Sequence, residues 1–360
     1  MTARRALGFT LLEMLLVVAL LAATAGMSLV LLGERDQQAR HDETERRLDD
    51  ALRAVAGDAA PVWGGQVRLS GFVADNGRLP VALRELSDRD GLADAAECAG
   101  GGPVAGALLA CHKLRAAVFD PTPSAADGFA NGSGDEIALT AAGERLPKGL
   151  RRYVEGRAGG AAWRDGWGNV GLNAGDDAAN FGWQLSLPAT AADPWVLTSL
   201  GSNNAVDAAP PSPDPEFVAD LSRRALADDW STDIAGWAVR VTNASGAVQP
   251  ASGARLGVSL LVWRNDAGGG RWKRLSTELD ATPLAPGESR ELHFAAGGYP
   301  GGALSTRVPL GEHLLLLFES ADAAAHDADD QPLLVAGRRI TTVARFFRGA
   351  GRPTVQLTLQ

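Results

Sequence analysis

The stretch Gly8-Phe9-Thr10-Leu11-Leu12-Glu13, together with the apolar run that continues it to Leu32, decides the fold of the N-terminal part. Phe9 to Leu32 comprises 24 residues, and Glu13 is the only charged residue among them. At about 1.5 Å per residue, such a helix can cross a hydrocarbon core of about 30 Å. We therefore predict a single membrane-spanning helix. Its carboxylate is a functional candidate, because a charge is costly inside a bilayer.

Two basic residues before the helix predict its orientation. Arg4 and Arg5 place the N-terminus in the cytoplasm by the positive-inside rule. Two simpler interpretations of the apolar run stay open. It could be a secretory signal cleaved at Ala23-Thr24-Ala25, although the run continues to Leu32. It could also be a plain single-span anchor, but an anchor does not explain the spacing of Gly8, Phe9 and Glu13.

The basic leader, Gly8, Phe9 and Glu13 resemble the class III leader of type IV pilins and type II secretion pseudopilins. The resemblance implies that a prepilin peptidase cleaves between Gly8 and Phe9 and that Phe9 becomes N-methylated. It also implies that Glu13 pairs with the terminal amine of an adjacent subunit during assembly. The expected partners are other pilin or pseudopilin subunits, the peptidase and an inner-membrane assembly platform. The chain would sit in the inner membrane, with its head in the periplasm or in an extracellular filament.

Charged residues after Leu32 predict that the helix continues to residue 60. Acids precede bases by four residues, the favourable order on a helix, in the pairs Asp36–Arg40, Asp42–Arg46, Glu43–Arg47 and Asp49–Arg53. Gly57 weakens the helix and Pro61 ends it. We therefore divide the N-terminal part into a leader, residues 1–8, and a helix, residues 9–60, whose second half is amphipathic.

Residues 61–207 are expected to form a small α+β head packed on this helix, as in pilins. Three segments resemble, in order, those of the major pseudopilin of type II secretion systems: Asp75-Asn76-Gly77-Arg78-Leu79-Pro80, Asp165-Gly166-Trp167-Gly168-Asn169 and Ser199-Leu200-Gly201. The family has an aromatic residue where this chain has Leu79, and proline where it has Gly166. Short strands are predicted over Trp183–Leu187 and Trp195–Leu200.

In the same family, the strand ending in S-x-G precedes an acidic calcium loop. The corresponding residues here are Ser202, Asn203, Asn204 and Asp207, only one of which is acidic. Hard cations such as calcium take several oxygen ligands, mostly carboxylates. The resemblance therefore implies a calcium site, and the alternative is a polar turn.

The two cysteines, Cys98 and Cys111, flank a glycine-rich loop in the head. If the head lies outside the cytoplasm, an oxidising compartment favours a disulfide between them. The alternative is a pair of free buried thiols.

A proline-rich segment, residues 208–216, is expected to be a linker to a second domain, residues 217–360. Seven short strands separated by glycine and proline clusters predict an antiparallel β-sandwich there. They are Ile234–Thr242, Leu256–Arg264, Trp272–Leu279, Ser289–Phe294, His313–Glu319, Arg339–Phe346 and Thr354–Leu359.

Net charge and the motifs of the sequence limit the classes of function that we expect for this chain. The net charge is −9 without a long basic run, which disfavours nucleic-acid binding. The chain has no nucleophile elbow, phosphate loop or H-E-x-x-H motif, so we do not expect an enzyme. The expected function is that of a pseudopilin or minor pilin of a type II secretion pseudopilus or type IV pilus-like filament. Two alternatives stay open: an adhesin that binds a surface or glycan through the sandwich, and an anchored extracytoplasmic enzyme.

Overall fold

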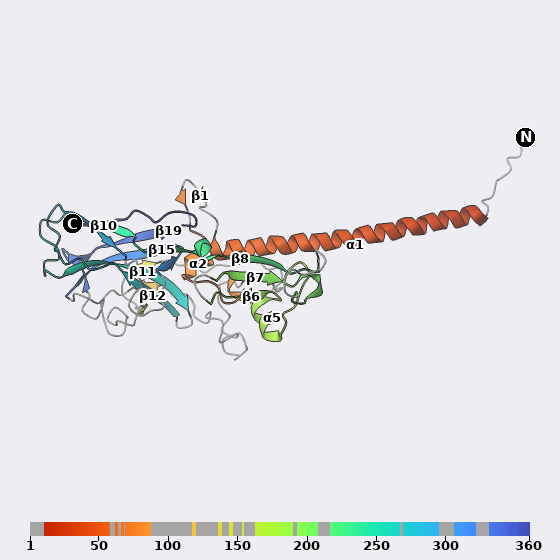
Figure 1. Ribbon diagram of the computed structural model, residues 1–360, viewed down its shortest axis with the longest axis horizontal. Coiled ribbons are helices and arrows are strands. Elements are labelled where there is room, and N and C mark those ends of the chain that lie inside the picture. Colours follow the sequence, from red (N-terminus) through yellow and green to blue (C-terminus); the bar gives the residue numbers. More distant parts are fainter. Residues whose placement is uncertain are drawn as a thin grey trace, which may run out of the picture.

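The computed structural model combines one long N-terminal helix with several antiparallel sheets, an α+β arrangement, as predicted. Figure 1 shows an elongated molecule in which the helix projects from the sheets. The structure describes residues 11–57, 62–63, 66–67, 69–87, 117–119, 136–138, 144–146, 153–154, 163–189, 193–207, 217–266, 269–294, 306–321 and 331–360.

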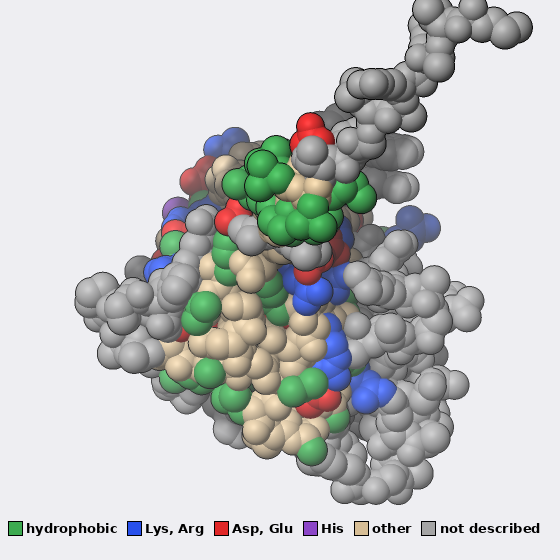
Figure 2. All heavy atoms as spheres, turned by 90° about the vertical axis from the view of Figure 1, so that its right-hand side faces the viewer, with side chains coloured by type: hydrophobic (Ala, Val, Ile, Leu, Met, Phe, Trp, Pro, Cys, Tyr) green, Lys and Arg blue, Asp and Glu red, His purple; other side chains and the backbone are tan. Residues whose placement is uncertain are grey.

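Helix α1 spans Leu11–Ala56, 46 residues or about 70 Å at the standard helical rise. It is long and apolar enough to cross a membrane. Its described apolar side chains before residue 33 are exposed, and Figure 2 shows hydrophobic side chains gathered around the projecting helix. The helix ends at Ala56, earlier than the predicted residue 60, because Gly57 turns the chain with a φ of +77°.

Two of the four predicted ion pairs on α1 are present. They are Asp36–Arg40 at 2.9 Å and Glu43–Arg47 at 2.7 Å. The other two arginines form ion pairs with acids different from those predicted. Arg46 pairs with Glu43 and Asp50, and Arg53 pairs with Asp50. Asp49 instead contacts Arg223, at 2.7 Å, so this acid joins the helix to the sheet beside it.

The second half of α1 packs against a small group of helices and strands. These are α2 (Phe72–Asn76), α3 (Arg84–Ser87), α5 (Ala174–Asn180), β6 (Gln184–Ser186), β7 (Trp195–Ser199) and β8 (Leu221–Ala225). Leu48, Ala51 and Val55 of α1 share a buried cluster with Trp183 and Trp195. The apolar stripe of the helix is therefore covered only along this half.

Strand β8 lies on the far side of the proline-rich segment but pairs antiparallel with β7, in the order β6-β7-β8. Trp195 faces Ala225 and Ser199 faces Leu221 in this register. Arg223 of β8 reaches both Asp49 and Glu45 of α1. Residues 221–225, which we expected to belong to the C-terminal domain, thus complete the sheet that packs on α1.

The seven strands predicted after residue 230 all have counterparts. They are β10 (Ala238–Asn243), β11 (Arg255–Asp266), β12 (Gly269–Ser276), β13 (Ser289–His293), β15 (Gly311–Ser320), β19 (Thr341–Phe346) and β20 (Gln356–Leu359). One sheet has the order β13-β10-β20, and β20 runs parallel to β10, so this pairing differs from the antiparallel arrangement that we predicted. The other has the order β16-β15-β11-β12-β4, and β19 also pairs with β15.

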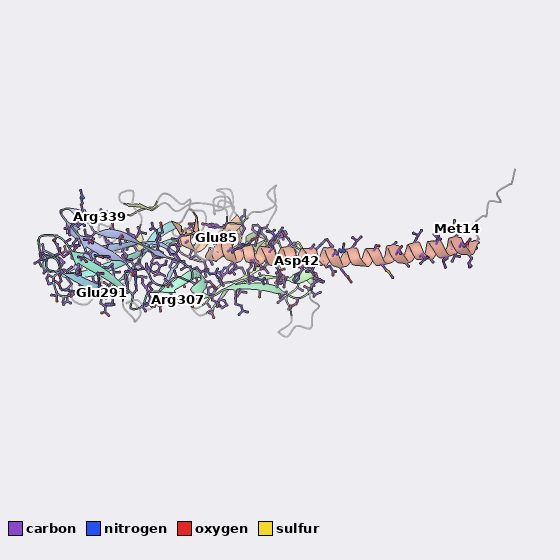
Figure 3. The ribbon with its side chains drawn as sticks, turned by 90° about the horizontal axis from the view of Figure 1, so that it is seen from above. Met14, Asp42, Glu85, Glu291, Arg307 and Arg339 are labelled. Carbon is purple, nitrogen blue, oxygen red and sulfur yellow. The ribbon has the colours of Figure 1, made fainter. Side chains whose placement is uncertain are left out.

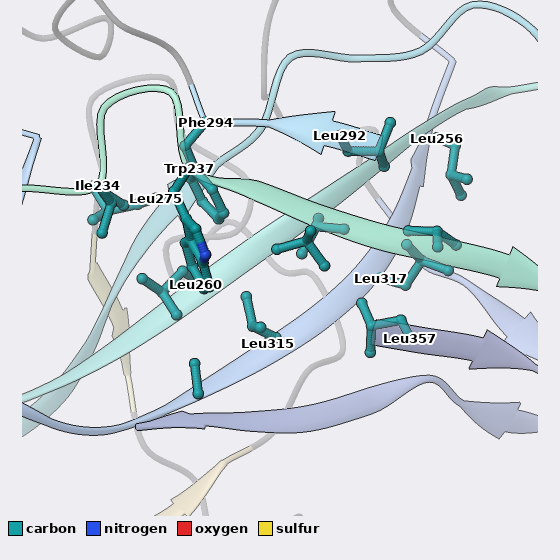
Figure 4. Packing of buried hydrophobic residues seen from close by; sticks show 14 of the residues in the cluster. Ile234, Trp237, Leu256, Leu260, Leu275, Leu292, Phe294, Leu315, Leu317 and Leu357 are labelled. Carbon is teal, nitrogen blue, oxygen red and sulfur yellow. The ribbon is translucent and has the colours of Figure 1, made fainter. Parts of the chain in front are cut away.

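Both of these sheets contribute alternate residues to one buried cluster, drawn in Figure 4. Val239 and Val241 of β10 share it with Leu315 and Leu317 of β15. Trp237 stacks on Phe294 with ring centroids 5.1 Å apart, and its other neighbour is the edge-on ring of Phe346 at 5.2 Å. Burial of large apolar side chains on this scale is the main stabilising contribution to such a unit.

Several short elements complete the described parts. They are α6 (Ala227–Trp230), β1 (Val62–Trp63), β2 (Gln66–Val67), β3 (Ala117–Phe119), β4 (Glu136–Ala138), β5 (Glu144–Leu146), β9 (Ser231–Asp233), β14 (Arg307–Pro309), β16 (Gln331–Pro332), β17 (Leu334–Val335) and β18 (Arg338–Arg339). Strand β4, which precedes the head sheet in sequence, pairs with β12 of the C-terminal part.

Candidate functional site

The sequence-predicted processing residues fall at the start of the chain. Gly8 and Phe9 lie outside the described residues, as do Cys98 and Cys111. Glu13 lies in the first turn of α1, within its exposed apolar half. A carboxylate at this position would be the only charge in the part of the helix that can enter a membrane.

A buried hydrogen-bond network joins two motifs that are distant in sequence. Asn169 donates from its backbone N–H to Asp165 Oδ1 at 2.9 Å and from Nδ2 to Asp165 Oδ2 at 2.8 Å. The hydroxyl of Ser199 donates to the same Oδ2 at 2.6 Å. The amide of Asn169 also donates to the carbonyl oxygen of Gly201 at 2.8 Å. The network therefore holds the end of β7 against the segment that begins at Asp165.

Gly166 brings this segment into contact with α1. Its backbone N–H donates to Thr44 Oγ1 at 3.0 Å, and a Cβ added at this position would lie 2.0 Å from the carbonyl oxygen of Arg40. Proline has no N–H to donate and carries a Cβ. The helix therefore passes too closely for proline, the residue that the resembling motif has at this position.

The chain also differs from the resembling motif at Leu79, where that motif has an aromatic residue. Another residue of the segment, Asp75, is contacted by an aromatic residue distant in sequence, Tyr153. Tyr153 packs edge-on against Phe72, with ring centroids 5.5 Å apart. Its hydroxyl donates to Asp75 Oδ2 at 2.7 Å. Asp75 is in α2, whose last residue is followed by Gly77 with a φ of +67°. Tyr153 therefore connects the turn motif to the core of the head.

After β7 the chain forms a compact loop, residues 201–207. It opens with the 3₁₀ turn Gly201–Asn203, and Asn204 has a φ of +52°. The side chains of Ser202 and Asn203 are exposed, and Asn203 Oδ1 accepts a bond of 3.0 Å from the backbone N–H of Ala205. These two side chains therefore point to local turn structure more than to a buried ligand shell.

The other two predicted ligands are placed differently. Asp207 and Asp220 exchange bonds: each backbone N–H donates to the other carboxylate, at 3.1 and 2.8 Å. Asn204 Oδ1 and Asp207 Oδ1 are buried and accept no hydrogen bond from any residue that the structure describes. Buried oxygens without donors are costly, and oxygen is the ligand that calcium prefers. Asn204 and Asp207 are therefore the candidate ligands for a hard cation, and Asp220 lies beside them through its bonds with Asp207.

Sequence reasoning missed Asp220, because it lies beyond the proline-rich segment. The signal was its position directly before the strand-like residues 221–225, since antiparallel pairing with β7 brings it beside the loop. Within the described ranges, no group of three or more histidine, cysteine, aspartate or glutamate side chains could hold a metal. Amide and backbone carbonyl oxygens would have to complete the ligand shell.

Hydrogen bonds between charged side chains surround Glu43 in the second half of α1 and connect this part of the helix to the loop that contains Arg164. Hydrogen bonds from Arg46, with a further contribution from Arg47, lower the pKa of Glu43 to about 2. In the loop beside it, the Arg164 guanidinium donates two bonds to Asp177, of 2.6 and 2.9 Å, and lowers the pKa of that carboxyl. Arg47 also donates to the carbonyl oxygen of Arg164. Helix and loop are therefore linked by ionised groups.

In comparisons with known proteins, no family model, no curated protein and no solved structure matches this chain.

Proposed function

We propose that the chain is a pseudopilin or minor pilin, cleaved by prepilin peptidase between Gly8 and Phe9 and methylated at Phe9. Before assembly, it would reside in the inner membrane with its N-terminus in the cytoplasm. It would then assemble through α1 into a type II secretion pseudopilus or a type IV pilus-like filament. Its partners would be other pilin or pseudopilin subunits and an inner-membrane assembly platform.

One observation carries the proposal: α1 is a continuous helix whose second half is packed and whose apolar first half is exposed. An exposed apolar surface of this size needs a cover. A bilayer covers it before assembly, and the same half of neighbouring copies covers it afterwards. A plain anchor needs only the bilayer, and it gives no role to the acid at Glu13.

On assembly, Glu13 would pair with the terminal amine of a neighbouring copy. Cleavage after Gly8 creates an amine at Phe9, and Glu13 becomes the fifth residue of the mature chain. In an apolar surrounding, breaking one side of an ion pair is strongly unfavourable, so such a pair is suited to fixing the register between helices. The carboxylate would therefore select copies whose terminal amine lies at the correct height.

The remaining finer assignments belong to the same proposal. The group of α2, α3, α5 and β6 to β8 would be a pilin-like head, and the two sheets around Trp237 a β-sandwich. Calcium would bind in the loop after β7, held by Asn204, Asp207 and Asp220. There it would supply positive charge among buried oxygens and stabilise the loop.

Intact mass and filament incorporation test the main proposal. Glu13→Ala should be cleaved normally but should enter filaments at least tenfold less than the unmodified chain. Glu34→Ala, an exposed acid just beyond the apolar run, is the matched control and should assemble normally. A mature mass that starts at Met1 or after Ala25 would exclude prepilin processing. Normal incorporation of Glu13→Ala would exclude the pairing role.

An adhesin is the second candidate, favoured by the position of the C-terminal sheets. Figure 1 shows them at the end of the molecule remote from the apolar half of α1. Such a unit would point away from the membrane. Binding of filaments to a surface or glycan array, lost when this unit alone is blocked by an antibody, would support it.

A further inference from the structure

Strand β20 forms one edge of the sheet β13-β10-β20. The carbonyl oxygens of Val355 and Leu359 accept hydrogen bonds of 3.1 and 2.8 Å from backbone N–H groups of β10 and of the residue that follows it. Backbone groups of successive strand residues point to opposite sides of the strand, so those of Gln356, Thr358 and Gln360 point away from β10. No strand that the structure describes pairs with this outer edge.

The other edges of the two C-terminal sheets are protected against further pairing. Strand β13 carries Arg290 and Glu291, and the carbonyl oxygen of His293 accepts a bond of 3.0 Å from the backbone N–H of Glu278. In the second sheet, β19 carries Arg345, β16 has two residues of which one is proline, and β4 has three residues. Charges, prolines and short strands are the means by which proteins keep sheet edges from pairing.

The sequence of β20 lacks this protection and reads the same in both directions. The stretch Gln356-Leu357-Thr358-Leu359-Gln360 contains no charge, no proline and no glycine. Leu357 and Leu359 are buried in the core, so the three polar side chains lie on the solvent face of the sheet. Two such strands in antiparallel order, centred on Thr358, place threonine opposite threonine, leucine opposite leucine and glutamine opposite glutamine.

We propose that the outer edge of β20 binds the same edge of a second copy of this chain, with Thr358 of both copies at a two-fold axis. Thr358 points its backbone groups outward, and two such residues directly opposite each other exchange a pair of hydrogen bonds in an antiparallel ladder. Gln356 and Gln360 add bonds of the same kind on either side. A second copy is the occupant because the residue order is self-complementary, as a two-fold contact requires, and because no like charges meet.

Strand β20 runs along the long axis of the molecule, away from α1. Arg352, shortly before the strand, donates to the carbonyl oxygen of Asp233 at 2.9 Å, and Asp233 lies in β9, which directly follows α6 beside α1. In Figures 1 and 3 the C-terminal sheets continue the long axis beyond α1, and in Figure 1 the C-terminal end lies at the extreme opposite the N-terminus. Antiparallel pairing of β20 therefore places the two α1 helices at opposite ends of the dimer.

This geometry joins two surfaces instead of two neighbours on one surface. Helices anchored in one membrane point the same way, so copies that pair through β20 must come from two separate membranes or filaments. One short strand pair is a small contact beside the 1,200–2,000 Å² or so that stable complexes bury. Many copies on each surface would act together, because multivalent binding strengthens attachment without new contacts. The inference goes beyond the proposed filament function and does not depend on it.

Clustering of phosphatidylcholine vesicles that carry the full chain tests the proposal. Two vesicle populations with different dyes should cluster when both carry the unmodified chain. Thr358→Lys on both populations, or Thr358→Glu on both, should reduce clustering at least fivefold, because like charges then meet at the axis. Vesicles with Thr358→Lys mixed with vesicles with Thr358→Glu should cluster again. Ser289→Lys, at an exposed position of the opposite edge strand β13, is the matched control and should cluster normally.

Clustering that survives Thr358→Lys, or that is absent with the unmodified chain, overturns the proposal. Loss of clustering without recovery in the mixed pair also overturns it, because the edge then binds something other than its own copy. Oxidation of Thr358→Cys is a second measurement. Residues in a hydrogen-bonded antiparallel pair have Cα atoms about 5.5 Å apart, within reach of a disulfide, so a covalent dimer should form. Ser289→Cys should stay monomeric, and the absence of a Thr358→Cys dimer contradicts the predicted register.

Discussion

The side-chain amide of Asn169 donates one hydrogen bond to Asp165 Oδ2 and another to the carbonyl oxygen of Gly201, each of 2.8 Å. This single side chain thus joins the segment that contacts α1 to the loop after β7. Both acceptors are in buried residues, so neither can exchange its bond for one to bulk water. The position of the loop therefore depends on this amide.

Asn169→Ala should destabilise the protein by about 1–3 kcal/mol, because the buried carbonyl oxygen of Gly201 loses this donor and Asp165 Oδ2 keeps only Ser199. Chemical denaturation of the detergent-solubilised chain measures this loss. Ser202→Ala, an exposed position of the same loop, is the control and should change stability by less than about 0.5 kcal/mol. Equal effects of the two substitutions would show that the amide does not position the loop.

Calcium should bind to the loop that contains Asp207. Calorimetric titration of the chain with calcium chloride should give heat of binding and a raised melting temperature. Asp207→Asn and Asp220→Asn should each weaken binding at least tenfold, since they remove ligand charge while keeping the shape. Asn203→Ala, whose Oδ1 bonds within the turn, should retain binding. Titration without heat and without a melting shift would support the polar-turn alternative.

Proline at position 166, the residue found there in the pseudopilin motif that this segment resembles, should destabilise the protein. The added atoms would collide with the backbone of α1 at Arg40, and overpacking of this kind costs about 1–3 kcal/mol. Gly166→Pro should cost more than Gly166→Ala, because it also removes the N–H bonded to Thr44. Gly246→Ala, where nothing lies within 4 Å of the added Cβ, should be close to neutral. Stability unchanged by Gly166→Pro would contradict the close approach of the helix.

Acid should weaken the protein partly through Glu43. Its pKa falls from 4.5 to about 2 in the folded state, so its stabilising contribution is fully present above about pH 4.5 and disappears as the pH falls toward 2. Glu43→Gln should therefore reduce the slope of the unfolding free energy against pH in this window. Glu34→Gln on the same helix is the control. Identical slopes for Glu43→Gln and the unmodified chain would exclude this contribution.

Local patterns predicted much of the fold. The acid-first charge pairs indicated a helix beyond the apolar run, and α1 continues through them to Ala56. Glycine and proline clusters separated the predicted C-terminal strands, and the predicted strand Ser289–Phe294 corresponds closely to β13. The predicted strand His313–Glu319 contains the apolar run from Leu314 to Phe318, and all five residues of that run are buried in β15. These features depend on neighbouring residues, which a sequence displays directly.

Features that depend on distant pairing were not predicted. The proline-rich segment has the composition of a domain boundary, but β8 returns after it to pair with β7. No pattern in the residues near Arg223 predicts its ion pair with Asp49, which lies 174 positions away in the sequence. The same return brings Asp220 to Asp207, so the candidate site was predicted with one of its two acids missing.

The return of β8 also limits how the protein can be shortened. If the chain ended in the proline-rich segment, β7 would lose one of its two antiparallel partners and the buried side chains of Trp195 and Leu197 would lose part of their cover. An unpaired strand edge beside exposed aromatic surface is a template for aggregation. Proteolysis before Leu221 should therefore yield an insoluble head, and the polypeptide must continue through β8 before its N-terminal part can remain in solution.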